Sequence, residues 1–526
     1  MRLTSLDLGI FIVYMLAVLG VGLYAARRGT KTKRDYFLAG DKLPWWMIGG
    51  SIVAANISSH HFVGVMGTAY NRGFVAMVIE WGSILVGFNA LLWIFLPFYL
   101  RNGFYTVPEF LHRRFGSSVR TTYATLILLT YVVVEIAAVL YMGALAVNVL
   151  MPGIPLTYSV VVLAVATGLY TILGGLRAVV WTEMLQLGVL LTGGILLSIY
   201  TIRAVGGVSA VLDTQREWDL LLPASDPDFP WTMYLGGTLC TSVFYCAANQ
   251  FIVQRALAAK DEWHARMGVV FTMYLKFLMP LIIIIPGLVA PKLFPDLARP
   301  DLVFPTLVRN LLPAGLVGLV MAGLIAAVMG HTSGAINSCT TIATIDFYLP
   351  WKKRRGDVDG TDAQAVRFGR MFGIIVIIVG IVGAEVLTHH SKKPIFVLLL
   401  NAYGYFTPGI ATMFLLGILW KRTTTPGALA AGLLTIPLSL ALQWTFPKLA
   451  FQNRTGIVFW TCMVVCAAVS LMTTPKREEE LKGLIWTRDS LHLPPEERGK
   501  YRGVRRPFVW WAIVTAAVLY FYVRYA

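Results

Sequence analysis

The chain has 526 residues, of which 57% are hydrophobic and only 13% carry a charged side chain. Soluble globular proteins carry about 25% charged residues, so this composition excludes a water-soluble protein. The net charge of +17 does not indicate nucleic acid binding, because the basic residues lie in short loops between apolar runs.

Apolar runs of about 20 residues recur along the whole chain, and each is long enough to cross roughly 30 Å of hydrocarbon. These runs do not alternate as barrel strands do, so we expect an all-α membrane protein with about 14 transmembrane helices. In chain order the expected spans are residues 6–26, 44–71, 74–100, 121–151, 156–175, 181–205, 232–254, 266–290, 312–346, 369–389, 394–419, 427–446, 455–473 and 507–525.

The charges between the spans predict the orientation of the chain. A basic cluster follows the first span instead of preceding it, which is atypical of a signal peptide and places the N-terminus outside the cytoplasm. The basic loops, among them one with Arg255 and Lys260, then face the cytoplasm, and the acidic loop at 206–231 faces outward. We therefore expect a multi-pass protein of the cell membrane with both termini extracytoplasmic. The basic segment 474–506 is either a solvated linker or an amphipathic element on the lipid surface.

Two polar stretches interrupt the apolar spans. AANISSHH at residues 54–61 lies in the second span, and CAANQ at residues 246–250 lies about five spans later. Broken helices are tolerated at this depth where they line a cavity, and their freed carbonyls can coordinate ions and polar substrates. Each stretch is therefore either such a break or a continuous helix whose polar groups are satisfied by neighbours.

The spacing of the two stretches predicts the division of the chain. It fits two inverted five-helix repeats, at residues 44–205 and 232–422, separated by the acidic loop at 206–231. Residues 1–43 then form a first peripheral span with a basic loop, and residues 423–526 form the peripheral C-terminal spans.

Ionisable residues inside spans are functional candidates, because a charge in lipid costs several kcal/mol unless it is paired or faces water. They are Glu80, Glu135, Glu183, Lys276, Glu385, His60, His61 and His331. Glu80 and Ser83 share one helix face, which suits a polyhydroxylated solute, although a structural ion pair of Glu80 with Lys276 is an alternative. The five cysteines are predicted to be small core residues, and the chain lacks the clustered nucleophile and base of an enzyme.

A series of short motifs occurs in a characteristic order. They are DYFLAG (35–40), LPWW (43–46), AANIS (54–58), EW (80–81), GFYTVPEF (103–110), YTILGGLRAVVWTEMLQ (170–186), NQFIVQRALAAK (249–260), and the stretches 337–348 and 407–421. The set resembles the sodium:solute symporter family, and within it the sodium/glucose and sodium/galactose branch. This resemblance implies a leucine-transporter-type fold, with an inverted five-helix repeat, extra peripheral helices and a substrate site in the middle of the membrane.

The resemblance also implies a set of substrate-binding positions. In this chain they are Asn56, His61, Glu80, Ser83, Asn249 and Lys276. His61 stands where the family has a glutamine, and a further family glutamine falls on Leu400, beside Asn401. A sugar-like or cyclitol-like solute is therefore implied, without the identity of a particular sugar.

The resemblance further implies a sodium site, from which this chain departs. The implied ligand positions are Ala54, Ile57, Ala327, Gly330 and His331. The first three would offer carbonyl oxygens, and the last two stand where the family has serine hydroxyls. Hard cations prefer oxygen ligands, whereas Gly330 has no side chain and His331 offers a nitrogen or, when protonated, a positive charge.

Three interpretations of this departure stay open. The chain binds Na⁺ through an altered shell, or His331 takes a proton in place of the ion, or the carrier has a fixed imidazolium or no ion coupling. Thr332 and Ser333 would face away from the site on a regular helix. Glu183 beside Arg177 is either an inner gate pair or a surface ion pair.

We therefore expect a secondary active transporter, not an enzyme, that moves a small polar solute by alternating access, coupled to Na⁺ or H⁺. The alternatives are a symporter for an amino acid or organic acid and an ion-uncoupled carrier. The expected partners are the solute and the lipid bilayer, with no nucleic acid and no obligatory protein partner. No cofactor is expected, and Na⁺ enters only as a coupling ion.

Overall fold

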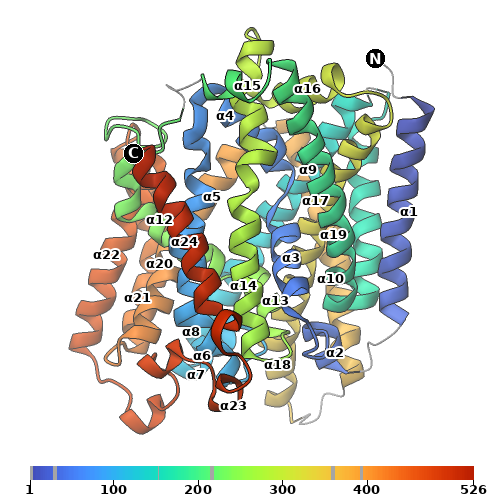
Figure 1. Cartoon of the computed structure of the whole chain (residues 1–526). Coiled ribbons are helices and arrows are strands. Elements are labelled where there is room, and N and C mark those ends of the chain that lie inside the picture. The colour runs from blue at the N-terminus through green and yellow to red at the C-terminus, as the bar shows by residue number, and fades with distance from the viewer. Residues whose placement is uncertain (1–3, 28–31, 152, 214–217, 357–361, 391–394) are drawn as a thin grey trace.

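The computed structural model describes residues 4–526 apart from 28–31, 152, 214–217, 357–361 and 391–394. Within these residues, eleven helices are long and apolar enough to cross a membrane. Figure 1 shows the long helices running between two ends of one bundle. The chain is therefore an all-α membrane protein, as its composition predicts.

The N-terminal part of the bundle contains several short helices, some of which continue into π-helical stretches. Its helices are α1 (Ser5–Arg27), α2 (Lys33–Leu38), α3 (Trp45–Asn56), α4 (Met66–Arg72), α5 (Val78–Gly82), α6 (Leu96–Arg101), α7 (Val107–Phe115), α8 (Ser117–Leu129) and α9 (Ile136–Leu150). The π-helical stretches are His61–Val65, Ser83–Phe88, Leu91–Phe95 and Thr130–Glu135. Such stretches are frequent at functional sites, and two of them begin at the candidate residues His61 and Ser83.

The remaining helices include the longest of the chain. They are α10 (Leu156–Ala204), α11 (Val208–Leu212), α12 (Gly237–Ala247), α13 (Gln250–Leu257), α14 (Glu262–Phe277), α15 (Ile285–Leu293), α16 (Val303–Leu311), α17 (Leu316–Ile342) and α18 (Leu349–Arg354). The C-terminal part contains α19 (Asp362–His390), α20 (Ile395–Leu419), α21 (Thr425–Thr445), α22 (Phe451–Met472), α23 (Pro495–Arg498) and α24 (Pro507–Arg524).

The difference between eleven long helices and 14 expected spans has a local cause. Gly175 (φ 56°, ψ −154°) breaks the helical geometry inside α10, and Gly73 (φ 73°, ψ −151°) separates α4 from the turn before α5. The left-handed backbone of both positions favours glycine. At Gly175 a Cβ would also lie 2.3 Å from the carbonyl oxygen of Tyr36. The long helix Leu156–Ala204 thus covers two of the expected spans, and His61–Arg101 covers the second half of one span and all of the next. The expected span 232–254 is broken into α12 and α13, which are too short to count.

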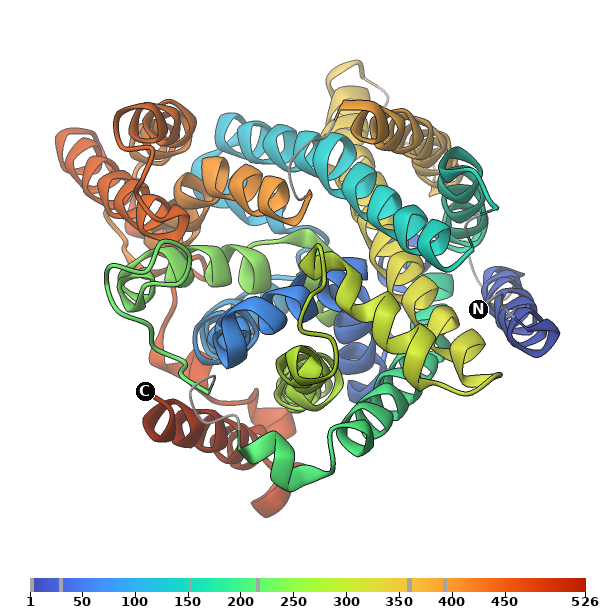
Figure 2. The ribbon, with the colours of Figure 1, turned by 90° about the horizontal axis from the view of Figure 1, so that it is seen from above.

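The core of the bundle lies around α17, which is buried over most of its length and packs against α10. The helices at the periphery expose apolar side chains instead, for example Val13 on α1 (67% exposed) and Val523 on α24 (82% exposed). Figure 2 shows these two helices at separate edges of the bundle, as lipid-facing helices are placed. All five cysteines are buried and free, which confirms that they are core residues.

Glycines allow α3 to approach α14 closely. A Cβ on Gly49 would lie 2.5 Å from the carbonyl oxygen of Gly268, and a Cβ on Gly268 would lie 2.6 Å from the Ile48 side chain. Small residues at helix contacts let membrane helices pack backbone to backbone. This contact fixes the helix that carries Lys276 against the helix that ends at the first polar interruption.

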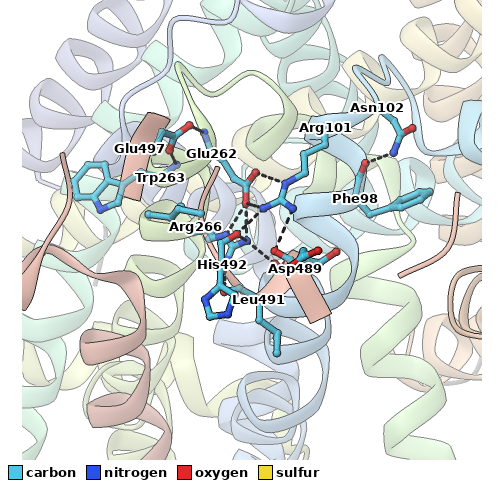
Figure 3. Close-up of polar contacts among 12 residues, drawn as sticks. Phe98, Arg101, Asn102, Glu262, Trp263, Arg266, Asp489, Leu491, His492 and Glu497 are labelled. Carbon is cyan, nitrogen blue, oxygen red and sulfur yellow. Dashed lines mark hydrogen bonds and ion pairs between the residues drawn. The ribbon is translucent and has the colours of Figure 1, made fainter. Parts of the chain in front are cut away.

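The basic segment 474–506 packs on the bundle instead of forming a long amphipathic helix. Arg266 on α14 donates to the carbonyl oxygens of Ser490, Leu491 and His492, at 2.6 Å, 3.0 Å and 3.2 Å. Arg101 at the end of α6 donates to the carbonyl of Asp489 (Figure 3). Both arginines are held by the Glu262 carboxylate, so the segment rests on a charged cluster at the ends of α6 and α14.

Candidate functional site

The first polar interruption is a break in the helix. α3 ends at Asn56, and the next residue, Ile57, is extended (φ −78°, ψ 122°). The Ser58 backbone N–H donates to Nδ1 of His61 at 3.2 Å, so a side chain replaces the helical partner of this N–H. The break predicted within residues 54–61 is confirmed, and it places the implied ion-site carbonyls of Ala54 and Ile57 at a helix end.

The second interruption is also a break. α12 ends at Ala247, and Asn249 (φ −105°, ψ 119°) caps α13 by accepting from the Phe251 N–H at 3.0 Å. Tyr99 and Tyr123 donate to the carbonyls of Ala247 and Ala248, at 3.0 Å and 2.5 Å. These buried hydroxyls satisfy backbone groups that the break leaves without helical partners.

Glu80 is held between a histidine and a lysine. Its Oε1 lies 2.9 Å from Nε2 of His61, and its Oε2 accepts from Lys276. Because Nδ1 of His61 already accepts a backbone N–H, a neutral His61 carries its proton on Nε2 and donates to Glu80. Lys276 balances the carboxylate charge, so the predicted ion pair is present. Ser83 donates to the Glu80 carbonyl at 2.6 Å, which leaves its oxygen as an acceptor.

A cavity of about 140 Å³ lies beside this network. Five of the six implied substrate positions line it, namely Asn56, His61, Glu80, Ser83 and Lys276. The sixth, Asn249, does not line it, because its side-chain oxygen accepts from Tyr131 and from the cap of α13. The buried amide oxygen of Asn56 has no hydrogen-bond partner among the described residues, so it can accept from a solute hydroxyl.

Other residues that line the cavity were not predicted as substrate contacts. Glu135 and His60 stand out in the sequence as ionisable residues within spans, but Tyr403 and Gln452 carry no sequence signal, because neutral polar residues are ordinary in membrane helices. The side chains of Leu400 and Asn401 lie outside the described residues.

His331 is held at both ring nitrogens. Its Nδ1 lies 2.8 Å from the Ala55 carbonyl, and its Nε2 lies 2.5 Å from the Glu135 carboxylate. A carbonyl only accepts, so Nδ1 carries a proton, and a second proton must lie between Nε2 and the carboxylate. Tyr403 donates to the other carboxylate oxygen. The imidazole therefore bonds the end of α3 directly, where the resemblance implies a serine that binds sodium.

Gly330 faces two oxygens. A Cβ at this position would lie 2.8 Å from the Ala54 carbonyl oxygen and 3.0 Å from Oε1 of Gln186. The Gln186 oxygen is buried and has no partner among the described residues. Ser333 donates back to the Gly330 carbonyl at 2.9 Å, so it does not replace the missing hydroxyl. Ala327 lies buried within the unbroken α17.

The pairing expected for Glu183 is wrong. Its carboxylate accepts from Arg255 and Ser51 in a fully buried cluster, and Arg177 is not its ion-pair partner. The expected placement of Arg255 in a cytoplasmic loop is also wrong, because this side chain is buried. α13 continues to Leu257 after the second break, which carries Arg255 back into the bundle.

Comparison with known proteins agrees with this architecture. The model of the sodium:solute symporter family matches residues 36–435. The sodium/glucose cotransporter of Vibrio parahaemolyticus is 34% identical over 518 residues, which cover 92% of this chain and 93% of the relative. The human sodium/myo-inositol cotransporter is 30% identical and aligns over 93% of this chain and 76% of its own length.

Solved structures show the same fold. A Na⁺-coupled sialic acid symporter in a substrate-bound, outward-open state superposes with a TM-score of 0.81, at 22% identity, over 90% of this chain and 99% of that one. A nucleobase-cation-symport-1 family transporter superposes with a TM-score of 0.57 at 14% identity, over 87% and 98%. At these identities the likeness concerns the fold alone. Because the family model covers most of the chain and the relatives align over nearly all of it, the chain belongs to the sodium:solute symporter family, a family of transporters and not of enzymes.

Proposed function

We propose that the chain carries a small, neutral, polyhydroxylated solute across the cell membrane by alternating access, in symport with Na⁺. The observation that carries this proposal is the cavity beside the first helix break, in which Glu80 offers acceptor oxygens that His61 and Lys276 hold in place. The charges of Glu80 and Lys276 balance each other, which favours a neutral solute over an organic acid or amino acid. The named relatives transport glucose and myo-inositol, in agreement with a sugar-like or cyclitol-like solute.

The proposed architecture is 14 spans, with inverted repeats at 44–205 and 232–422 joined by the loop 206–231 and flanked by 1–43 and 423–526. The two breaks, α3 to His61 and α12 to α13, occupy corresponding places in these repeats and support the division. We further propose that both termini are extracytoplasmic. In Figure 1 both ends of the chain lie toward one end of the bundle and α23 toward the other, in support of an even number of crossings.

The proposed ion site is the end of α3, with carbonyl ligands from Ala54, Ile57 and Ala327. The amide oxygen of Gln186 lies near the place of the serine that Gly330 lacks, and an amide oxygen suits a hard cation. The C-terminal end of a helix also carries partial negative charge that favours a cation. His331 then acts as a positioning residue, which bonds the Ala55 carbonyl beside the site.

The solute class is tested in reconstituted vesicles. Uptake of labelled myo-inositol or glucose is competed with other sugars, cyclitols and organic acids. We expect Glu80→Gln to abolish uptake while the protein still inserts. Glu479→Gln, which removes the same group from an exposed segment, should leave uptake unchanged. Normal uptake by Glu80→Gln, or competition by organic acids alone, would exclude the proposed solute site.

The coupling ion is tested separately from the solute. Vesicles with an imposed Na⁺ gradient are compared with vesicles that have an imposed pH gradient and no Na⁺. We expect the Na⁺ gradient to stimulate uptake. Stimulation by the pH gradient alone would replace Na⁺ with H⁺ as the coupling ion, and no response to either gradient would identify an uncoupled carrier.

A further inference from the structure

A second cavity, of about 720 Å³, lies where the basic segment 474–506 meets the start of α24. It shares no lining residue with the cavity around Glu80. Aromatic rings of Trp93, Phe508 and Trp511 form part of its wall, and the side chains of Arg498 and Arg506 line it as well. A large apolar wall beside arginines is the pattern of a site for an amphipathic anion.

The charge of this region is strongly one-sided. Residues 498–506 contain five basic side chains and no acidic one, directly before the membrane helix α24. Arg506 makes no side-chain hydrogen bond or ion pair with the described residues, and Arg498 uses only its Nε, which donates to the Leu493 carbonyl at 2.6 Å. Clusters of four to eight basic residues next to a membrane helix attract anionic lipid headgroups.

Aromatic side chains of the cavity wall lie at the start of α24. Phe508 is 57% exposed at the first turn of α24, although it is a large apolar side chain. Trp511, near the start of the same helix, is placed as tryptophan is at a lipid–water boundary.

The frame of the cavity is held firmly. Arg266 donates to the carbonyls of Leu491 and His492, and the Glu262 carboxylate fixes the arginine in turn (Figure 3). The Tyr501 ring stacks on Trp263, with ring centres 4.2 Å apart. The segment that carries Arg498 and Arg506 is therefore ordered against the bundle before any ligand binds, which lowers the entropic cost of binding.

We propose that this cavity binds an anionic phospholipid of the surrounding membrane. The headgroup phosphate pairs with Arg498 and Arg506, and the acyl chains lie against Phe508 and Trp511. The apolar wall distinguishes this ligand from a soluble phosphate, which would gain nothing from the aromatic rings. The site is independent of the transported solute and of the coupling ion.

The full-length protein in detergent is the material for the test, and native mass spectrometry counts the bound lipid molecules. We expect phosphatidylglycerol to bind more tightly than phosphatidylcholine of the same chain length. The double variant Arg498→Gln, Arg506→Gln should lower the affinity for phosphatidylglycerol roughly 30-fold, as the loss of two basic residues near a headgroup predicts. Arg477→Gln with Lys482→Gln is the matched control, because both side chains are exposed on the same segment and neither lines the cavity.

Two further measurements distinguish a bound lipid from a soluble phosphate. Phe508→Gln should weaken phosphatidylglycerol binding without changing the melting temperature of the lipid-free protein. Inorganic phosphate should not displace the lipid. Equal affinity for the two lipids, an equal loss in the control pair, full binding by Phe508→Gln, or displacement by inorganic phosphate would each overturn the proposal. The melting temperature confirms that each variant is folded.

Discussion

The buried pair of Glu183 and Arg255 gives a quantitative test of how the bundle is held together. Arg255 donates to both carboxylate oxygens, to the Ser51 hydroxyl at 2.8 Å and to the Phe251 carbonyl, and both charged residues are 0% exposed. The cluster joins α10 to α3 and α13, the two helices next to the breaks. Glu183→Gln keeps the shape of the side chain and removes only its charge.

This change leaves a guanidinium buried without its counter-charge. Removing one partner of a buried ion pair costs about 3–5 kcal/mol, whereas replacing both with apolar residues is often neutral. The unfolding entropy of about 2.1 cal/mol/K per residue gives about 1.1 kcal/mol/K for 526 residues. We therefore expect the melting temperature of Glu183→Gln to fall by roughly 3–5 °C. The double variant Glu183→Leu, Arg255→Met should recover most of this loss.

The melting temperature is followed by tryptophan fluorescence of the purified protein, and the double-mutant cycle isolates the coupling between the two side chains. The exposed pair Lys421–Glu478, with side chains 65% and 84% exposed, provides the control. Glu478→Gln should leave the melting temperature unchanged, because exposed ion pairs contribute little. The reasoning is refuted if Glu183→Gln melts with the wild type, or if the double variant loses as much as the two single variants together.

Three further predictions concern packing, the basic segment and the solute cavity. Gly49→Ala should lower the melting temperature by roughly 1–3 °C, since overpacking costs about 1–3 kcal/mol. Gly20→Ala should leave the melting temperature unchanged, because nothing lies within 4 Å of the new Cβ. Equal melting temperatures of the two variants would contradict the close approach of α3 and α14. Glu262→Gln should release residues 488–498, seen as faster hydrogen exchange there, and unchanged protection would show that the charged cluster does not hold the segment. Lys276→Met should reduce uptake at least tenfold while the protein still inserts, because the Glu80 carboxylate loses its balancing charge. Uptake by this variant at the wild-type rate would show that Lys276 is not part of the solute site.

The features that were predictable from sequence are those that the bilayer imposes on the chain. Long apolar runs must be helical, because lipid offers no partner for backbone groups. The polar stretches around Asn56 and Asn249 stand out against those runs, and both proved to be breaks. Glu80 and Lys276 were recognisable as costly charges in spans, and each needs the other for the same electrostatic reason.

The features that were not predictable depend on contacts between distant segments. Arg255 lies at the end of an apolar stretch, which predicts a loop residue, and its partner Glu183 is 72 residues away in the sequence. His331 and Glu135 each stand out alone, but the sequence gives no sign that a separation of 196 residues brings them together. The bends at Gly73 and Gly175 depend on the backbone angles of these two glycines, and the composition of the surrounding sequence does not specify those angles.

Among the described residues, three buried acid–base pairs join the range 44–205 to the range 232–422, and in each of them the acid lies in the first range. They are Glu80–Lys276, Glu135–His331 and Glu183–Arg255. If these ranges are the repeats that move against each other, every pair ties one moving part to the other. Separating such a pair in a medium of low dielectric constant costs several kcal/mol unless another polar group takes the place of the lost partner.

The surroundings of each pair then decide when it can separate. Glu80 and Lys276 line the solute cavity, so hydroxyls of a bound solute can replace the bonds that the two side chains lose. Glu183 and Arg255 are fully buried and do not line the solute cavity, so a bound solute cannot replace the bonds between them. Solute binding therefore lowers the cost of separating the first pair and leaves the cost of separating the second unchanged. This difference favours opening of the two pairs at different stages, which alternating access requires, because a carrier in which both pairs opened together would leak.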